Sequence, residues 1–174
     1  PTGIQVPATV QAVLASRIDR LTPEDKRLLH AASVIGKDVP LALIRGIAEM
    51  PEDALRESLA RLQAAEFLFQ RGLFPDIEYT FTHALTHDVA YASLLQDRRR
   101  ALHTQILEAM ETLYPERRSE QVEVLAHHAY RGEKWEKAVL YLRQAGIKAS
   151  GRSANQEAAA FFEQALAALA HESD

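Results

Sequence analysis

The apolar residues of this chain change their period near its middle, and that change limits the folds open to it. Residues 67–69 form a short apolar run, and residues 77–82 alternate between apolar and polar side chains. Arg71-Gly72 and Pro75-Asp76, which lie between them, are typical of turns. Strict alternation favours a half-buried strand, so we predict a β-hairpin over these residues.

Helical signals precede this hairpin. Apolar residues recur every three or four positions over residues 8–21, as on one face of an amphipathic helix that follows Pro7. Hydroxyl caps, first-turn prolines and glycine stops then divide the next residues into short helices. The expected signals are an N-cap at Thr22 with Pro23, a stop at Gly36, and new starts at Pro40 and Pro51.

Only helices are expected after the hairpin. The predicted ranges are 83–95, 97–113, 119–132, 134–149 and 154–170. Ser119 is the expected cap of the third of these helices. A capping box from Ser153 to Gln156 is expected to start the last one.

Small residues in the last helices follow the spacing of tetratricopeptide (TPR) repeats. One frame consists of Leu125, Ala126, Ala129, Ala138, Leu142 and Ala145, and a second, shifted by 20 residues, of Ala145, Gly146, Ala149, Ala158, Phe162 and Ala165. Small side chains let antiparallel helices approach closely. Fewer than three full repeats are present, so we expect a truncated array.

These patterns predict a mainly α fold. Residues 1–95 have the element order of a winged helix with one β-hairpin, and residues 96–174 that of antiparallel TPR-like helices. The 20 basic and 24 acidic residues are interspersed, and the net charge of −4 favours neither nucleic acid nor a membrane surface as a partner. The absence of cysteine and of a long apolar run is typical of a cytoplasmic protein.

The chain opens on Pro-Thr-Gly without a methionine, so we expect a fragment of a longer protein or a processed product. Neither a phosphate-binding Gly-x-x-x-x-Gly-Lys-Ser/Thr loop nor a Gly-x-Ser-x-Gly elbow occurs. We therefore expect no enzyme in these residues, and any ATPase or cyclase activity to lie elsewhere in the parent protein.

Three stretches carry a resemblance to a known family: VPATVQAVLASRIDRLTPEDKRLLHAASVIG, FTHALTHDVAY and RRRALH. Together with the helices that follow, they resemble the region after the nucleotide-binding domain in STAND-class (AAA-like) signalling ATPases. The nearest variety is bacterial, with an adenylate or guanylate cyclase domain or a transcription-regulator domain. The resemblance runs from about Val6 to Ala170.

This resemblance implies a regulatory role. In the family, the winged helix packs on the ATPase domain and holds its ADP-bound off state, while the repeats receive an inducing protein or small molecule. Some members place the histidine of a Met-His-Asp motif on the ADP phosphate. His83 matches that histidine, with Thr82 in place of the methionine and Ala84 in place of the acid.

The role of His83 has two interpretations. As a nucleotide sensor, its imidazole N–H would join the unpaired backbone N–H groups at a helix start, where an anion is favoured. The alternative is a buried histidine satisfied by the hairpin. The fragment itself is expected to hold no cofactor, and ADP or ATP would belong to the parent protein.

The spacing of two histidines also makes a metal site a candidate. His83 and His87 are four apart on one predicted helix, but Ala84 stands where zinc peptidases carry a glutamate. We expect no metal here, with plain binding that involves His103 or His127 as the alternative. For His127 and His128, one packed and one solvated ring is the simpler expectation.

Two further features are candidate partner sites. Three cations at Arg98, Arg99 and Arg100 lie near a predicted helix start, which is mildly unfavourable. One of them could meet an acidic partner, although a solvated helix start is the favoured explanation. Trp135, the sole tryptophan, is expected to pack on the preceding helix, with an exposed interaction anchor as the alternative.

Three functions therefore remain open. The preferred one couples a TPR-like sensor to an upstream nucleotide-binding domain in the same parent chain. The second is a stand-alone winged-helix DNA-binding regulator, which the acids of residues 51–62 oppose because phosphate repels them. The third is a helical protein-interaction scaffold.

Overall fold

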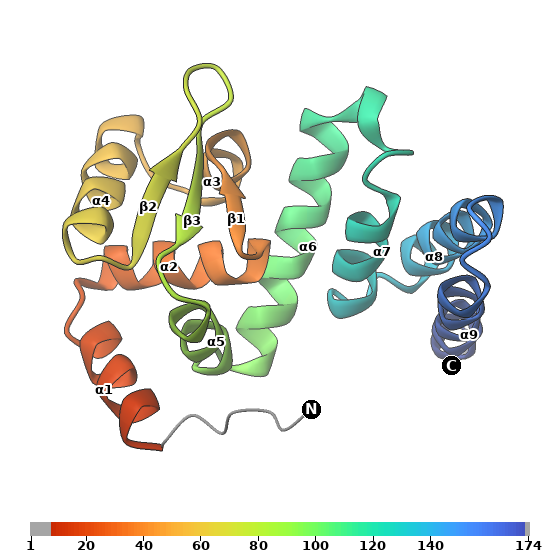
Figure 1. Ribbon diagram of the computed structural model, residues 1–174, viewed down its shortest axis with the longest axis horizontal. Coiled ribbons are helices and arrows are strands. Elements are labelled where there is room, and N and C mark those ends of the chain that lie inside the picture. Colours follow the sequence, from red (N-terminus) through yellow and green to blue (C-terminus); the bar gives the residue numbers. More distant parts are fainter. Residues whose placement is uncertain (1–7, 173–174) are drawn as a thin grey trace. The chain divides into compact units, whose positions relative to one another are not determined.

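The computed structural model describes residues 8–172 and divides the chain into two compact units (Figure 1). The N-terminal unit is Pro1–Gln96 and the C-terminal unit is Asp97–Asp174. Pro7, the predicted first-turn residue, lies outside the described residues. No helix within residues 8–172 has the length and apolar character needed to cross a lipid bilayer.

Helices dominate both units, as predicted. The N-terminal unit contains, in order, α1 (Ala8–Asp19), α2 (Pro23–Ile35), β1 (Asp38–Pro40), α3 (Leu41–Ile47), α4 (Glu52–Ala64), β2 (Leu68–Arg71), β3 (Glu78–Phe81) and α5 (Ala84–Ala92). The C-terminal unit contains α6 (Gln96–Leu113) from its second residue on, a 3-10 turn (Pro115–Arg117), α7 (Val122–Arg131), α8 (Trp135–Gly151) and α9 (Asn155–Glu172).

The predicted hairpin forms, but it belongs to a three-stranded antiparallel sheet of order β1-β3-β2. Val39 of β1 lies opposite Tyr79, and Pro40 lies opposite Glu78 at the edge of the sheet. Proline has no N–H to donate, so an edge strand is where it is tolerated. The strand was missed because three residues are too few to show alternation.

Local signals set the ends of α2 as expected. The Thr22 hydroxyl accepts a hydrogen bond from the Asp25 N–H at 3.2 Å, and Pro23 occupies the first turn. Gly36 ends the helix with φ +142°, a backbone conformation that favours glycine. Gly72 is required in the hairpin turn because a Cβ there would lie 2.3 Å from the Asp76 carbonyl oxygen.

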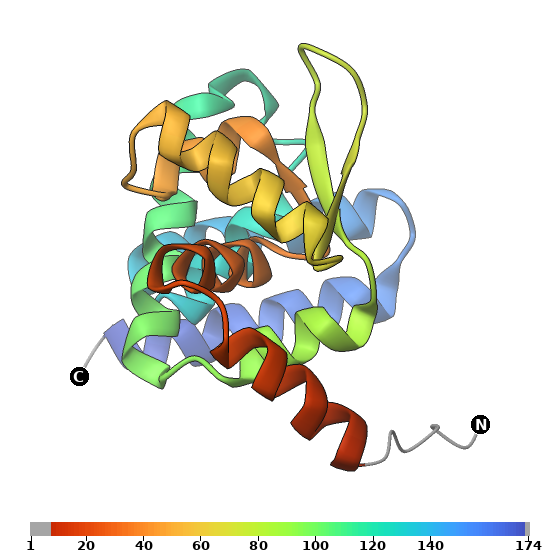
Figure 2. The same cartoon turned by 90° about the vertical axis from the view of Figure 1, so that its left-hand side faces the viewer.

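The core of the N-terminal unit consists of large aliphatic and aromatic side chains between the helices and the sheet. In Figures 1 and 2, α2 crosses one end of the sheet and α4 lies beside β2. The most deeply buried side chains include Ile18, Leu28, Leu29, Ile44, Leu55, Leu62 and Leu68. The leucine spacing of α4 therefore buries Leu55, Leu59 and Leu62, as predicted.

The first helix is less buried than its pattern predicted. Leu14 and Ile18 are buried, whereas Val10 and Val13 are exposed. The apolar stripe is wider than the surface available to it, because within this unit α1 packs mainly on α5. Part of the stripe thus remains an exposed apolar face.

One buried carboxylate links α2 to α4 through hydrogen bonds. The Asp25 carboxylate accepts hydrogen bonds from the Ser58 hydroxyl and from Arg61, whose Nε and Nη2 lie 2.8 Å from its two oxygens. The Arg61 hydrogen bond lowers the pKa of Asp25. A buried carboxylate is tolerated here because it is fully partnered.

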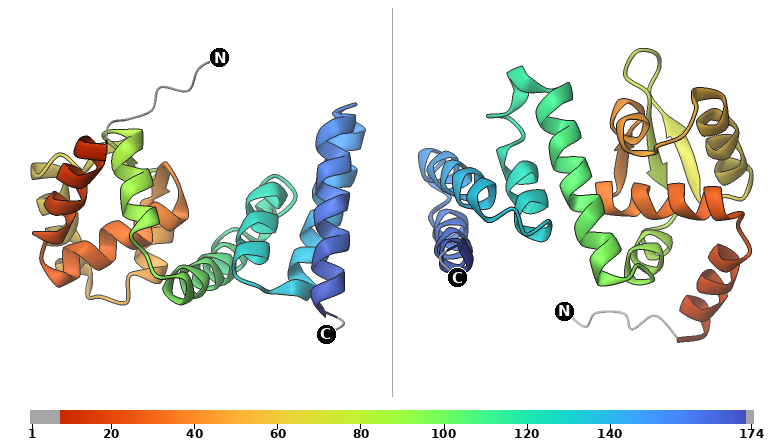
Figure 3. Two further views of the ribbon diagram at one scale, coloured as in Figure 1. Left: turned by 90° about the horizontal axis from the view of Figure 1, so that it is seen from below. Right: turned by 180° about the vertical axis from the view of Figure 1, so that it is seen from behind.

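Small residues line the core of the C-terminal unit. The helices α8 and α9 run side by side along their lengths (Figure 3), and α7 packs on α8. The buried small residues include Ala126, Ala129, Ala138, Ala145, Ala149 and Ala158. At the closest approach, a Cβ on Gly146 would lie 2.7 Å from the Phe162 ring.

Two helix starts differ from the prediction. Ser119, the predicted cap, follows the 3-10 turn, and α7 begins only at Val122, with Gln121 as its N-cap. Ser153 has φ +60° and bonds back to Ser150, so it ends α8 instead of starting α9. The first α9 bond runs from the Ala158 N–H to the Ala154 carbonyl.

Candidate functional site

Three histidines of the C-terminal unit lie together and are here named the histidine cluster: His103 from α6, with His127 and His128 from α7. One ring nitrogen from each lies within 4.8 Å of the other two. The Nδ1 atoms of His103 and His128 are 2.9 Å apart, which makes them hydrogen-bond partners. The ring centroids are 5.1 to 5.4 Å apart.

Helix periodicity places these rings. His103 falls on the buried stripe of α6 with Ile106 and Met110, and His128 falls on the buried stripe of α7 beside Leu125. His127 is one residue away from His128, about 100° around the helix, and is exposed. The expectation of one packed and one solvated ring is confirmed.

Burial keeps the two inner rings neutral. His103 and His128 are each 1% exposed. Burial, with the nearby His127, Arg131 and Arg99, lowers the pKa of His103 to about 3, and burial beside His103 and His127 lowers the pKa of His128 to about 3. Desolvation and Arg131 also lower the pKa of His127.

Neutral imidazoles can share a proton or bind a transition metal. Within residues 8–172, this cluster is the one group of three histidine or acidic side chains arranged as a metal could require. The sequence had raised His103 and His127 only as the alternative to no metal. The signal that could have found His103 and His128 is histidine at core positions of two amphipathic helices, and His127 is the sequence neighbour of His128.

His83, the predicted nucleotide contact, lies at the N-cap of α5 with an exposed side chain. Among the described residues its imidazole makes no capping hydrogen bond. His87 is held differently: its ring meets Phe81 edge-on at 5.2 Å, and its Nδ1 lies 3.0 Å from an Asp88 carboxylate oxygen. The two rings thus have different surroundings despite their spacing.

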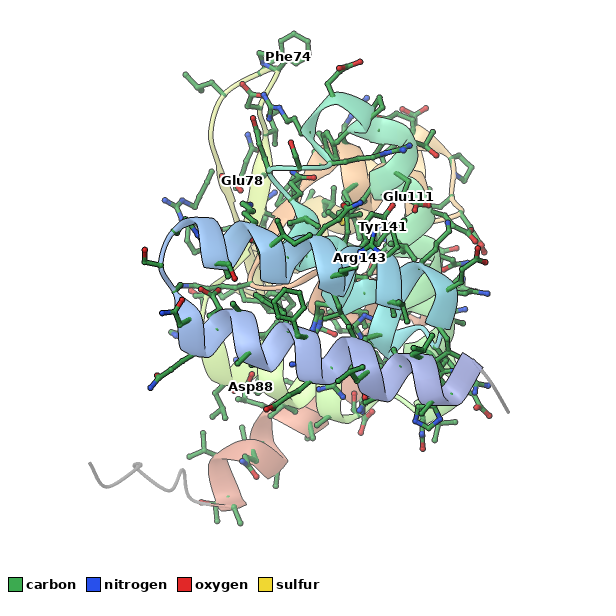
Figure 4. All side chains as sticks on the ribbon, turned by 90° about the vertical axis from the view of Figure 1, so that its right-hand side faces the viewer. Phe74, Glu78, Asp88, Glu111, Tyr141 and Arg143 are labelled. Atoms are coloured by element: carbon green, nitrogen blue, oxygen red, sulfur yellow. The ribbon has the colours of Figure 1, made fainter. Side chains whose placement is uncertain are left out.

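The groove beside α5 is open and mostly apolar. It has a volume of about 730 Å³ and lies between α1 and α5, with alanine, leucine and valine side chains on its walls. Asp88, labelled in Figure 4, is its charged wall residue. Such a surface is suited to an apolar partner more than to a phosphate.

The predicted partner residues lie at different places in the C-terminal unit. Arg98 is exposed and Arg99 half-buried, while Arg100 pairs with Glu133 at 2.8 Å and Asp97 at 3.1 Å. Arg100 therefore has its partners inside the chain.

Trp135 lies between two rings. It stacks on His171 with centroids 4.6 Å apart and meets Tyr130 of α7 edge-on at 5.6 Å. The simpler expectation, packing on the preceding helix, agrees with the Tyr130 contact. Its role as a partner anchor stays a prediction.

A second polar cluster joins α6 to α8. The Glu111 carboxylate accepts hydrogen bonds from Lys137 at 2.6 Å and from the Tyr141 hydroxyl at 2.5 Å; Figure 4 labels Glu111 and Tyr141. Burial and this carboxylate raise the pKa of Tyr141 to about 12. These groups satisfy one another's hydrogen-bonding capacity, so the cluster has a structural role and stabilises the contact between α6 and α8.

Comparisons with known proteins show a similarity to one bacterial protein. No protein-family model matches the sequence, and no solved structure matches it. An uncharacterized protein of Rhizobium meliloti (strain 1021) is 30% identical over 157 residues. The match covers 90% of this chain but 15% of the relative, so the chain spans only a small part of that protein's length.

Proposed function

We propose that this chain is a regulatory module of a larger signalling ATPase. In this proposal, the N-terminal unit is a winged-helix domain and the C-terminal unit is a TPR-like sensor, which together hold an upstream nucleotide-binding domain in its ADP-bound state. The element order α2-β1-α3-α4-β2-β3, with the sheet order β1-β3-β2, carries the proposal. That order agrees with a winged helix, in which β2 and β3 form the wing.

The charges of α4 favour a protein partner over DNA. This helix would be the recognition helix of a winged helix, yet Glu52 and Asp53 occupy its first turn. Its Arg61 is bound to Asp25, and Arg56 lies 3.5 Å from Asp53. A DNA-reading helix needs cations directed at phosphate and base edges, so these residues oppose that role.

The hairpin tip favours the same conclusion. Leu73 and Phe74 are 85% and 87% exposed, and Figure 4 shows Phe74 at the end of the loop. Apolar side chains at such a tip are typical of protein-contacting surfaces. The wing is therefore suited to an apolar surface on another domain.

The packing of the C-terminal unit supports a TPR-like role. Each residue of the first predicted frame is buried, and Gly146 and Phe162 of the second frame face each other. Exposed apolar side chains remain on α8 and α9, at Leu140, Ile147, Leu166 and Leu169. Repeat helices bury such faces against their neighbours and ligands.

His83 is the proposed ADP contact in the parent protein. Its exposed ring at the start of α5 can reach a ligand outside this unit, and helix N-termini favour anions. ADP or ATP would be bound by the parent's nucleotide-binding domain, and the chain itself is proposed to be non-enzymatic and cytoplasmic.

Nucleotide content of the full-length parent protein tests this role. The native protein, His83→Ala and His87→Ala are purified, denatured and analysed by chromatography. We expect ADP to be retained in the native protein and His87→Ala and lost in His83→Ala. ADP retained by His83→Ala, or absent from the native protein, would sink the sensor role.

The competing DNA function has its own test. A low-salt titration of nonspecific duplex, followed by fluorescence anisotropy, should show no salt-dependent binding, because α4 presents acids. Binding that weakens steeply with salt would instead support a DNA-binding regulator. Capture of a protein partner without any ADP dependence would support the scaffold alternative.

A further inference from the structure

We propose that His103, His127 and His128 form a binding site for one divalent transition metal ion, of which zinc has the best-matched coordination preferences. The site would join α6 to α7 within the C-terminal unit. It is independent of the ATPase proposal, because that proposal gives none of the three histidines a role.

The nitrogen geometry is close to that of a metal site. A tetrahedral zinc with bonds of about 2.0–2.1 Å holds neighbouring ligand atoms roughly 3.3 Å apart. The closest pair of the cluster, Nδ1 of His103 and Nδ1 of His128, is 2.9 Å apart, and each pair lies within 4.8 Å. Small rotations of the rings, mainly of the exposed His127, would bring the three nitrogens to one ion.

The ligand chemistry also fits. Zinc binds the unprotonated nitrogen of a neutral imidazole, and burial already keeps His103 and His128 neutral. In the metal-free state their facing Nδ1 atoms share one proton in a hydrogen bond. When a metal binds both Nδ1 atoms, this proton moves to the other nitrogen of its own ring, so both imidazoles remain neutral and no proton is released.

The position of the cluster provides access. His127 is exposed, whereas His103 and His128 are buried. An ion can therefore enter past His127 and reach the inner pair. Three protein ligands leave a fourth position for water or an anion, and an anion there would reduce repulsion from Arg99 and Arg131, whose charges act on His103.

Binding by the 174-residue chain tests the site. Zinc is titrated into chelator-treated protein against a chromophoric competitor, for the native chain, His127→Ala and His83→Ala. His127 is exposed, so its substitution leaves the core intact, and circular dichroism checks this. His83→Ala is the matched control, because it removes a ligand from the rival His83–His87 pair.

We expect one equivalent of zinc in the native chain and in His83→Ala, with an affinity at least about tenfold weaker in His127→Ala. Imidazole ¹H–¹⁵N spectra should shift at His103, His127 and His128 and stay unchanged at His83 and His87. Absence of binding, equal affinity in His127→Ala, or loss in His83→Ala would each overturn the assignment. So would shifts confined to other histidines.

Discussion

Both units of this chain bury large aliphatic side chains, but they differ in what else their cores contain. In the N-terminal unit, large side chains such as Ile44 and Leu62 fill the space between helices and a small sheet. In the C-terminal unit, alanines and Gly146 let the helices approach closely, and two buried histidines occupy core positions. Both units thus depend on buried apolar volume, and the C-terminal unit depends in addition on close helix approach and on a pair of neutral polar rings.

This difference predicts which kind of substitution destabilises each unit most. Removing a large side chain leaves a cavity, whereas adding an atom to a close helix contact causes overlap. The buried polar groups differ as well: the N-terminal unit holds a carboxylate partnered by arginine, and the C-terminal unit holds neutral imidazoles. The units should therefore respond differently to truncation, pH and enlargement.

Truncation in the large-residue core should give the largest effect. Leu62→Ala removes a fully buried side chain and should lower the free energy of unfolding by roughly 2–5 kcal/mol. Amide hydrogen exchange should lose protection in the N-terminal unit. The matched variant Leu142→Ala should lose protection in the C-terminal unit. If each variant lowered the exchange protection of both units equally, the two cores would not be separate, and the comparison would be contradicted.

Mild acid should destabilise the C-terminal unit first. The folded-state pKa of His103 and His128 lies near 3, below the ordinary 6.5, so the unfolded chain binds protons that the folded chain does not. Stability is full above pH 6.5 and falls as the pH drops toward 3. For each ring the loss is about 1.4 kcal/mol per pH unit, so the two rings together lose roughly 3 kcal/mol by pH 5.5.

Urea unfolding followed by Trp135 fluorescence, with a chelator present, reports this unit, since the sequence holds one tryptophan. The N-terminal unit should keep its exchange protection over the same range. The lowered pKa of Asp25 means that its pairing is lost only as the pH falls below its ordinary 3.8. Equal acid sensitivity of both units would contradict the assignment.

Loss of the buried carboxylate should have an intermediate effect. Asp25→Ala leaves Ser58 and Arg61 without their partner and should destabilise the N-terminal unit by roughly 2 kcal/mol. The estimate is reduced because the Arg61 side chain is 45% exposed. Arg56→Ala, at an exposed pair in the same helix, is the control and should change stability by less than about 0.5 kcal/mol.

Enlargement of α8 should give the smallest effect. Ala at Gly146 would place a Cβ 2.7 Å from the Phe162 ring, whereas Ala at Gly151 would meet nothing within 4 Å. Gly151→Ala, at the last residue of α8, should stabilise by up to about 0.5 kcal/mol through helix propensity. Gly146→Ala should be less stable than Gly151→Ala by about 1 kcal/mol, as measured by the Trp135 transition. Equal stability of the two variants would show that the Phe162 ring moves aside without a cost in free energy.

Local patterns predicted most of the elements in this fold. The cap at Thr22, the leucines of α4 and the alternation in β3 each place a structure whose cause lies within a few residues. The predictions that were wrong fall where the sequence signal covers very few residues or where one residue could serve two elements. The three residues of β1 show no period, and Ser153 could serve either the end of α8 or the start of α9.

The candidate sites divide in the same way. The sequence alone placed His83 at a helix start and His127 beside His128. It could not bring His103 to that pair, because 25 residues separate His103 from His128 and no local pattern encodes their contact. The hydrogen bonds of Asp25 with Ser58 and Arg61 could not be predicted for the same reason, because 33 and 36 residues separate the partners.

The sequence by itself therefore determined a mainly helical chain, its helix boundaries to within a few residues, and the hairpin at its middle. Only the tertiary structure decided the third strand, the buried acid and the histidine cluster. Periodicity and capping act over one or two helical turns. Pairing between distant side chains depends on how whole helices pack, and it has no local signature.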